Sequence, residues 1–94
     1  MKESIREYQL QHKFGITSSD YTRMWEDQGG VCKICKQPEP VKGRSLAVDH
    51  CHTTGKVRGL LCGLCNGGLG KFRDNPQLLK EAINYLEISK YGAK

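Results

Sequence analysis

The chain has 94 residues and a net charge of +5, with 15 Lys and Arg, ten Asp and Glu, and five cysteines. A domain this small buries only roughly 60 to 65% of the surface that its unfolded chain exposes, so we expect a disulfide, a metal or a partner to supplement a marginal hydrophobic core. In a reducing compartment, cysteines paired two residues apart favour a metal over disulfides. The opening MKESIREYQLQHK carries no secretory signal and no apolar run approaches the roughly 20 residues that span a bilayer, which excludes a membrane span and predicts a soluble, cytoplasmic protein.

The first predicted element is a short helix over residues 2–14. Its composition, KESIREYQLQHKF, favours a helix, and Gly15 ends the run. The apolar stripe is narrow and consists of Ile5, Tyr8 and His12. We therefore expect a partly exposed helix that docks loosely or on a partner.

A second helix is predicted to complete an N-terminal helical segment over residues 2–28. Thr17, followed three residues later by Asp20, forms a capping-box pattern. One face of this helix holds Tyr21, Met24, Trp25 and Gln28. Trp25 could be a wedge that stacks on nucleic-acid bases, but an aromatic residue at helical spacing is more often part of the core, and we assign it to the core.

A cysteine turn, a β-hairpin and a helix are predicted within residues 31–72. The segment VCKICKQPEPVKGR is predicted to form a tight turn and a loop. SLAVDHCH and VRGLL are predicted to be the two strands, joined by a turn at residues 53–56. CGLCNGGLGKF can begin a helix, although its glycines lower the helix propensity.

A final helix is predicted over residues 75–90. Asp74 or Asn75 can cap it, and Pro76 suits its first turn. Its apolar stripe consists of Leu78, Leu79, Ala82, Ile83 and Leu86. We expect this stripe to close the core of one small α+β domain over residues 1–94.

The basic excess favours a polyanionic partner, and nucleic acid is the first candidate. Membrane lipid is a weaker second, because no strongly amphipathic basic helix with large apolar anchors is present. A basic protein without a special partner is the alternative.

Two C-x-x-C pairs, with 26 residues between them, predict a metal site. A tight turn presents both sulfurs of each pair to one tetrahedral ion, so the pairs together make a closed, structural zinc site. Its ligands would be Cys32, Cys35, Cys62 and Cys65. A mixed site that uses Cys51 or His52 would abandon this complete set, and four unliganded core cysteines are improbable at such spacing.

Asp49, His50, His52 and Asn66 remain outside the cysteine pairs. Asp49 and His50 end the first predicted strand, and Asn66 follows the last paired cysteine at the start of a helix. Folding the hairpin over that helix brings Asp49 and Asn66 together as oxygen ligands, which suit magnesium, manganese or calcium. His50 is then a candidate general base, and strand alternation places His52 on the same side, where it can bind phosphate or orient the site.

The stretch LAVDHCHTTGKVRGLLCGLCNGGLG, with the preceding QGGVCKIC and the following leucine-rich helix, closely resembles the phage recombination endonuclease VII family. That family is a zinc-bearing branch of the HNH or ββα-metal nucleases. The resemblance therefore implies a small α+β, zinc-stapled ββα-metal (His-Me finger) fold with flanking helices. The resemblance covers roughly residues 14–87. The pair Asp49-His50, flanked by both cysteine pairs and VRGLLC, is a far more specific signal than an Asp-His pair alone.

The resemblance implies a DNA endonuclease in which Asp49 and Asn66 hold one catalytic magnesium or manganese ion and His50 activates the attacking water. Such an ion would stabilise the charge that develops on the phosphate and the 3′ leaving oxygen, leaving 5′-phosphate and 3′-hydroxyl ends. His52 matches a second histidine typical of this branch. Arg58 is a candidate phosphate contact, and a solvated basic residue is the alternative.

Two positions depart from the relatives. Many of them have DHDH where this chain has Cys51 in place of the second aspartate, and alternation places Cys51 with Asp49, facing the core. The phage resolvase of the family has a glutamate three residues after the asparagine, where this chain has Leu69, so no third acidic ligand is expected. That resolvase is an intertwined dimer with extra helical material. Here we expect nicking or nonspecific duplex cleavage by a monomer at least as readily as junction resolution, and a dimer is left open.

Two other functions compete with the endonuclease. A zinc-stabilised DNA-binding module without activity is favoured if Cys51 or Leu69 damages the site. A small accessory protein that binds another phage protein, for example in packaging, is the third alternative. The intact set of Asp49, His50 and Asn66 favours the endonuclease, acting in the host cytoplasm if the chain is phage-encoded.

Overall fold

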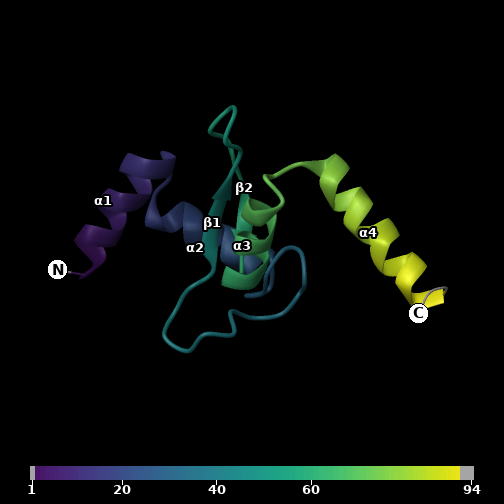
Figure 1. The fold of residues 1–94 in the computed structure, drawn as a ribbon. Helices are drawn as coiled ribbons and strands as arrows, with labels where there is room; N and C mark the ends of the chain where they lie inside the picture. The colour runs from purple at the N-terminus through teal and green to yellow at the C-terminus, as the bar shows by residue number, and fades with distance from the viewer. Residues whose placement is uncertain (1, 92–94) are drawn as a thin grey trace.

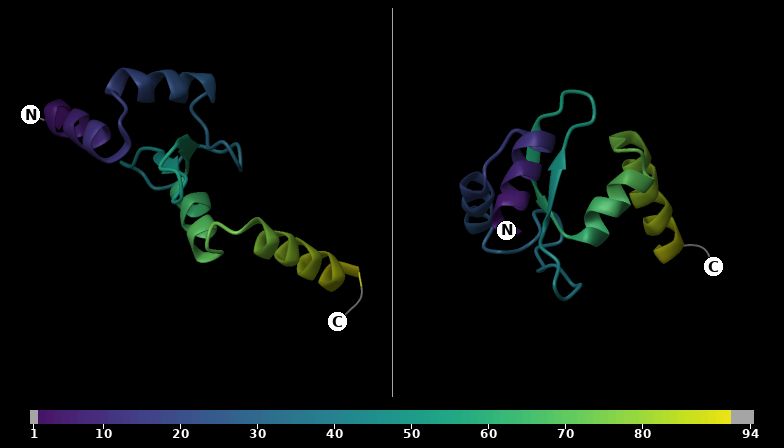
Figure 2. Two further views of the ribbon diagram at one scale, coloured as in Figure 1. Left: turned by 90° about the horizontal axis from the view of Figure 1, so that it is seen from above. Right: turned by 90° about the vertical axis from the view of Figure 1, so that its left-hand side faces the viewer.

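The computed structural model describes the backbone of residues 2–91 and the side chains of residues 8–88. Its elements in chain order are α1 (Lys2–Phe14), α2 (Ser18–Asp27), β1 (Ala47–His50), β2 (Val57–Leu61), α3 (Gly63–Lys71) and α4 (Pro76–Tyr91) (Figure 1). β1 and β2 form a hairpin, with α3 in front of it in Figure 1 and α2 behind it, as the left view of Figure 2 shows. α1 and α4 extend toward opposite ends, which makes the molecule 55 Å long. No helix in this described part is long and apolar enough to cross a membrane.

The predicted hairpin and the helix that follows it are confirmed. The strands pair antiparallel, with Asp49 opposite Gly59 and His50 opposite Val57. The intervening Arg58 is therefore an extra residue on β2, a β-bulge. β1 is shorter than the predicted SLAVDHCH strand, because Cys51 already belongs to the turn: its N–H donates to the carbonyl of Lys56 at 2.8 Å.

A small core lies between the hairpin, α1 and α2. The buried apolar residues among those described are Leu10, Tyr21, Leu46, Leu60 and Leu61, together with Cys32 and Cys62. The Tyr21 hydroxyl donates to the carbonyl of Leu46 at 2.5 Å. The Gln28 amide pairs with both backbone groups of Leu60, accepting from its N–H and donating to its carbonyl at 3.0 Å each, as a neighbouring strand would. One side chain thus satisfies an edge of the two-stranded sheet.

The N-terminal helices form as predicted. The predicted face of α2 packs inward through Tyr21 and Met24, whereas α1 buries a residue outside its predicted stripe. The capping box of Thr17 and Asp20 is present. Among the described side chains of α1, Leu10 is buried, whereas Tyr8 is 64% exposed and its ring stacks on that of His12. The predicted contribution of Ile5 lies outside the described side chains.

Assigning Trp25 to the core is wrong. Its side chain is 45% exposed and its ring covers Gly30, where an added Cβ would lie 2.7 Å from the ring. Tyr21 of α2 meets the core, whereas the Trp25 ring lies over the glycine turn that ends the helix.

α4 forms where it was predicted, with the Asn75 side chain accepting from the N–H of Gln77 at 2.8 Å. Its predicted role in closing the core is wrong, because Ile83 and Leu86 are 62% and 63% exposed. The turn before α4 holds Arg73 and Asp74 in the left-handed conformation, with φ of 58° and 56°. This turn directs α4 away from the hairpin, as Figure 1 shows, so its apolar stripe stays largely outside the core.

Candidate functional site

The two cysteine pairs meet as predicted. The Sγ atoms of Cys32, Cys35, Cys62 and Cys65 all lie within 4.8 Å of one another. Cys32 and Cys62 are buried, and the N–H of Cys65 points at the Sγ of Cys62, which caps the start of α3. The cluster therefore ties the turn after α2 to the hairpin and to α3.

The spacing of the sulfurs fits a tetrahedral zinc ion. Zinc–sulfur bonds of about 2.3 Å place two sulfurs of a tetrahedron about 3.8 Å apart. The Sγ atoms of Cys35 and Cys62 are 3.8 Å apart. Four sulfur donors and no oxygen donor make a set that zinc prefers over magnesium or calcium.

The acidity of the thiols fits a bound cation as well. Burial raises the pKa of the Cys32 thiol, but hydrogen bonds from nearby backbone N–H groups outweigh burial and lower this pKa to about 6. Burial and the neighbouring thiols raise the pKa of Cys65 to about 12. Cys32 thus ionises readily while Cys65 resists, because burial disfavours a second charge and the neighbouring thiols add to this effect. A divalent cation relieves this conflict by binding all of them as thiolates.

Asp49 lies at the far end of β1 from the cysteine cluster and is 9% exposed. Its carboxylate accepts two hydrogen bonds from the Arg58 guanidinium, from Nε to Oδ2 at 2.7 Å and from Nη2 to Oδ1 at 3.0 Å. Nη2 of Arg58 also donates to Oδ1 of Asp74 at 3.0 Å. The Arg58 hydrogen bond lowers the pKa of Asp74, and the two carboxylates, Asp49 first, raise the pKa of Arg58.

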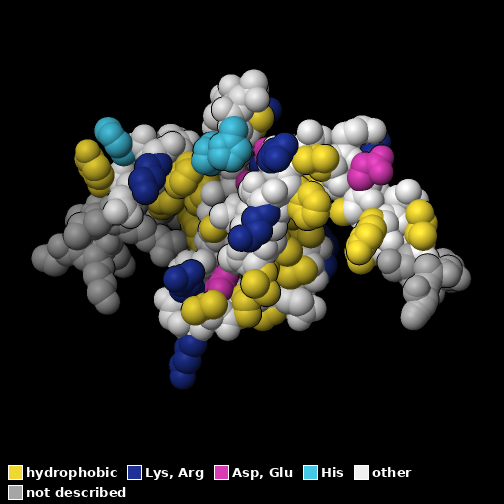
Figure 3. Space-filling view, viewed as in Figure 1, with side chains coloured by type: hydrophobic (Ala, Val, Ile, Leu, Met, Phe, Trp, Pro, Cys, Tyr) yellow, Lys and Arg dark blue, Asp and Glu magenta, His cyan; other side chains and the backbone are white. Residues whose placement is uncertain are grey.

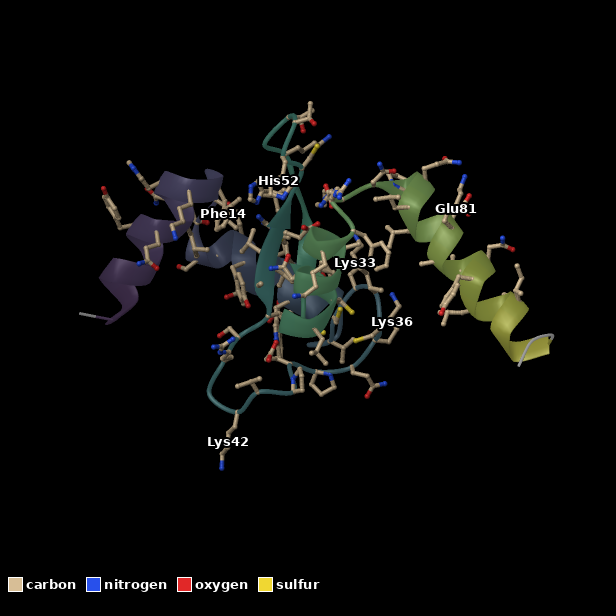
Figure 4. All side chains as sticks on the ribbon, in the orientation of Figure 1. Phe14, Lys33, Lys36, Lys42, His52 and Glu81 are labelled. Atoms are coloured by element: carbon tan, nitrogen blue, oxygen red, sulfur yellow. The ribbon has the colours of Figure 1, made fainter. Side chains whose placement is uncertain are left out.

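His50 and His52 lie on the same side of the hairpin, as alternation predicted. Their ring centroids are 5.0 Å apart, and the ring of Phe14 from α1 lies 5.4 Å from that of His50. Figure 4 labels Phe14 and His52, which lie on either side of the His50 ring, and Figure 3 shows histidine side chains at the surface there, next to a Lys or Arg side chain. Imidazole rings that solvent can reach are able to accept a proton from water at this surface.

Asn66 lies near the start of α3, is exposed, and directly follows Cys65 of the cysteine cluster. α3 contacts both strands, so it sets Asn66 on an element adjacent to the strand that carries Asp49. A carboxylate and an amide oxygen are hard donors that suit magnesium or manganese. The two hydrogen bonds from Arg58 occupy one lone pair on each carboxylate oxygen of Asp49, so further lone pairs on these oxygens can bind an ion. Joint coordination of an ion by Asp49 and Asn66 stays a prediction.

The sequence did not reveal the link from Arg58 to Asp49 and Asp74. Simple alternation pairs Arg58 with His50, but the bulge shifts the register and turns Arg58 toward Asp49. Gly59 was the available signal, since an isolated glycine within a strand pattern often marks a bulge.

The two departures from the relatives have structural explanations. Cys51 does not face the core: it is half-buried in the hairpin turn, where the Thr54 hydroxyl lowers the pKa of its thiol. Leu69 is half-buried and packs against the core from α3. An apolar residue at position 69 therefore supports the helix that carries Asn66.

Comparison with known proteins gives a consistent result. A family model described as recombination endonuclease VII matches residues 7–88. The Gene 59 protein of Mycobacterium phage L5 is 50% identical over 74 residues, covering 78% of this chain and 44% of that protein. The Gene 59 protein of Mycobacterium phage D29 is 49% identical over the same shares of the two chains.

A solved structure shares the fold. The ββα-Me type II restriction endonuclease Hpy99I superposes with a TM-score of 0.56 and 37% sequence identity, over 87% of this chain and 47% of that enzyme. The hairpin, α3 and the cysteine cluster are thus a ββα-metal fold. The chain spans less than half the length of these relatives.

Proposed function

Because this chain belongs to the recombination endonuclease VII family, we propose that it is a divalent-metal-dependent DNA endonuclease that hydrolyses phosphodiester bonds. The observation that carries the proposal is the placement of Asp49 and His50 on a hairpin strand that α3, with Asn66, packs against. The likeness to a ββα-Me restriction endonuclease supports the same chemistry.

His50 is the general base in this proposal. Imidazole titrates near neutral pH, so a neutral ring can accept a proton from the water that attacks phosphorus. The ring is half-buried between Phe14 and His52, which restricts its orientation. His52, more exposed and nearer to solvent, is proposed to contact the phosphate or orient His50.

Asp49 and Asn66 are the residues that would hold a catalytic magnesium or manganese ion. The chemistry that such an ion supplies is stabilisation of the negative charge on the phosphate and on the leaving 3′ oxygen. Asp49 is well suited as a ligand, because its carboxylate is almost buried and fixed by Arg58 before any ion arrives. The side chain of Arg58 is 38% exposed, so its predicted phosphate contact is compatible with both ion pairs.

The four-cysteine cluster is proposed to hold zinc with a structural role. Four protein ligands complete a tetrahedral shell and leave no position for water or substrate. The zinc would fix α3 on the hairpin, and so the position of Asn66 relative to Asp49.

The substrate is proposed to be DNA held through its phosphates by the basic surface, with little reading of base sequence. Nicking or duplex cleavage by a monomer is proposed ahead of junction resolution. A dimer, a phage protein partner and a location in the host cytoplasm stay predictions.

Cleavage of several DNA forms tests this proposal. Supercoiled plasmid, linear duplex and a four-way junction are incubated with the zinc-loaded protein in magnesium, in manganese and in EDTA, and binding is followed in parallel by gel shift. We expect cleavage only with the added ion, and nicks that DNA ligase reseals directly because they carry 5′-phosphate and 3′-hydroxyl ends. Binding of DNA without cleavage under every condition would refute the nuclease and favour the inactive DNA-binding module.

A further inference from the structure

The sequence pointed to Asp74 only as a possible cap of the last helix, yet its side chain is connected to the candidate nuclease site. Its Oδ1 accepts from Nη2 of Arg58 at 3.0 Å, and the same nitrogen donates to Oδ1 of Asp49 at 3.0 Å. The side chains of Asp49 and Asp74 are 11% and 21% exposed, so both ion pairs are partly shielded from water. Arg58 thus joins a strand residue of the site to the turn that follows α3.

The position of Arg58 depends on the β-bulge. Because the extra residue on β2 falls between the partners of Asp49 and His50, the Arg58 side chain is turned out of the regular alternation. The bulge alone does not fix the guanidinium, because the Arg58 side chain could still rotate toward solvent. The second carboxylate, from Asp74, restrains the fork in the orientation that meets both oxygens of Asp49.

Asp74 is itself held firmly. It adopts φ of 56° directly after Arg73 at 58°, a conformation that residues other than glycine rarely take twice in succession. The turn is secured by hydrogen bonds from the N–H of Asp74 to the carbonyl of Leu69 at 2.8 Å and from Arg73 to Gly70 at 2.9 Å. Both acceptors belong to α3, so Asp74 is fixed relative to the helix that carries Asn66.

We propose that Asp74 is a positioning residue for the nuclease site, which holds Arg58 so that its fork presents the Asp49 carboxylate to the metal ion shared with Asn66. This inference rests on the proposed function. The connection from β1 through β2 to α3 fixes the two metal-binding side chains relative to each other. Residues that orient metal ligands in this way commonly change metal affinity or activity by about 10- to 100-fold when they are removed.

Two variants at the same position separate positioning from charge. Asp74→Gly removes the carboxylate and tolerates the positive φ, so the turn is not strained. Asp74→Asn removes the same charge but keeps an oxygen that can accept from Arg58, and asparagine also tolerates this conformation. If Asp74 acts only through its charge, both variants should lose the same manganese affinity. If it positions Arg58, Asp74→Gly should lose more manganese affinity than Asp74→Asn.

Binding of manganese to the zinc-loaded protein without DNA is measured by electron paramagnetic resonance, together with plasmid nicking across manganese concentrations. We expect the manganese Kd of Asp74→Gly to rise about 10-fold, with nicking restored at saturating manganese, and that of Asp74→Asn to stay closer to the wild-type value. An unchanged Kd in Asp74→Gly, or equal losses in both variants, would overturn the inference. If Asp74→Gly loses zinc or helical structure, Arg58→Lys is measured instead, because lysine keeps the positive charge but cannot donate two parallel hydrogen bonds to Asp49. A wild-type manganese Kd in Arg58→Lys would then overturn the inference.

The two proposals fail in different ways. A wild-type protein that neither binds manganese nor nicks DNA would remove the proposed function itself. A wild-type protein that does both, with variants that behave like it, would remove only the role of Asp74.

Discussion

Loss of one zinc-cluster cysteine should unfold the domain. Cys62 is 1% exposed, its Sγ lies 3.8 Å from that of Cys35, and it caps the start of α3. Metal binding in small zinc domains is worth on the order of 10–16 kcal/mol. The net stability from the hydrophobic core of a domain this size rarely exceeds about 3–5 kcal/mol. Replacement of Cys62 by serine, which weakens zinc binding, therefore removes more free energy than the core can supply.

The assay compares Cys62→Ser with Cys51→Ser, the same substitution at the cysteine outside the cluster. Zinc per chain is measured by elemental mass spectrometry, and helix content by circular dichroism during urea unfolding. We expect Cys62→Ser to lose zinc and cooperative unfolding, while Cys51→Ser keeps one zinc and unfolds like the wild type. A Cys62→Ser protein that is folded, zinc-bound and fully stable would refute the reasoning, and so would loss of zinc from Cys51→Ser.

Three further substitutions test the packing, each read from urea unfolding of zinc-loaded protein. Leu60→Ala empties a fully buried site and should lower the free energy of unfolding by about 2–5 kcal/mol; a loss below this range would mean that the core around it collapses. Tyr21→Phe leaves the buried carbonyl of Leu46 without its hydroxyl donor and should cost about 1–3 kcal/mol, whereas wild-type stability would show that the bond contributes nothing. Thr17→Ala breaks the capping box and should cost about 1 kcal/mol, and an unchanged unfolding midpoint would argue against the cap.

The features predictable from the sequence are those set by local chemistry. The spacing within each C-x-x-C pair brings its two sulfurs close together, and two such pairs commonly bind one metal ion, so the cluster of Cys32 and Cys35 with the second pair could be predicted. The capping box at Thr17 and the cap at Asn75 also depend on neighbouring residues alone. The resemblance to a nuclease family followed from the same local pattern and was confirmed.

The features that escaped prediction depend on tertiary packing. The apolar face of α4 was expected to pack inward, but two left-handed residues in the preceding turn direct the helix away. Helical spacing put Trp25 in the core, although it is 45% exposed and its ring lies against Gly30 at the end of the helix. The ion pair between Arg58 and Asp49 depends on the β-bulge, and strict alternation of side chains along a strand cannot predict where a bulge falls.

The central claim is that His50 activates water for metal-dependent DNA hydrolysis on a separate zinc scaffold. The most direct measurement is the single-turnover rate of nicking of supercoiled plasmid in magnesium or manganese by wild type and His50→Ala, with zinc content and helix content first shown to match. The proposed mechanism predicts nicking by the wild type and a rate at least about 100-fold lower for His50→Ala. Undiminished nicking by His50→Ala at the same zinc content would contradict it.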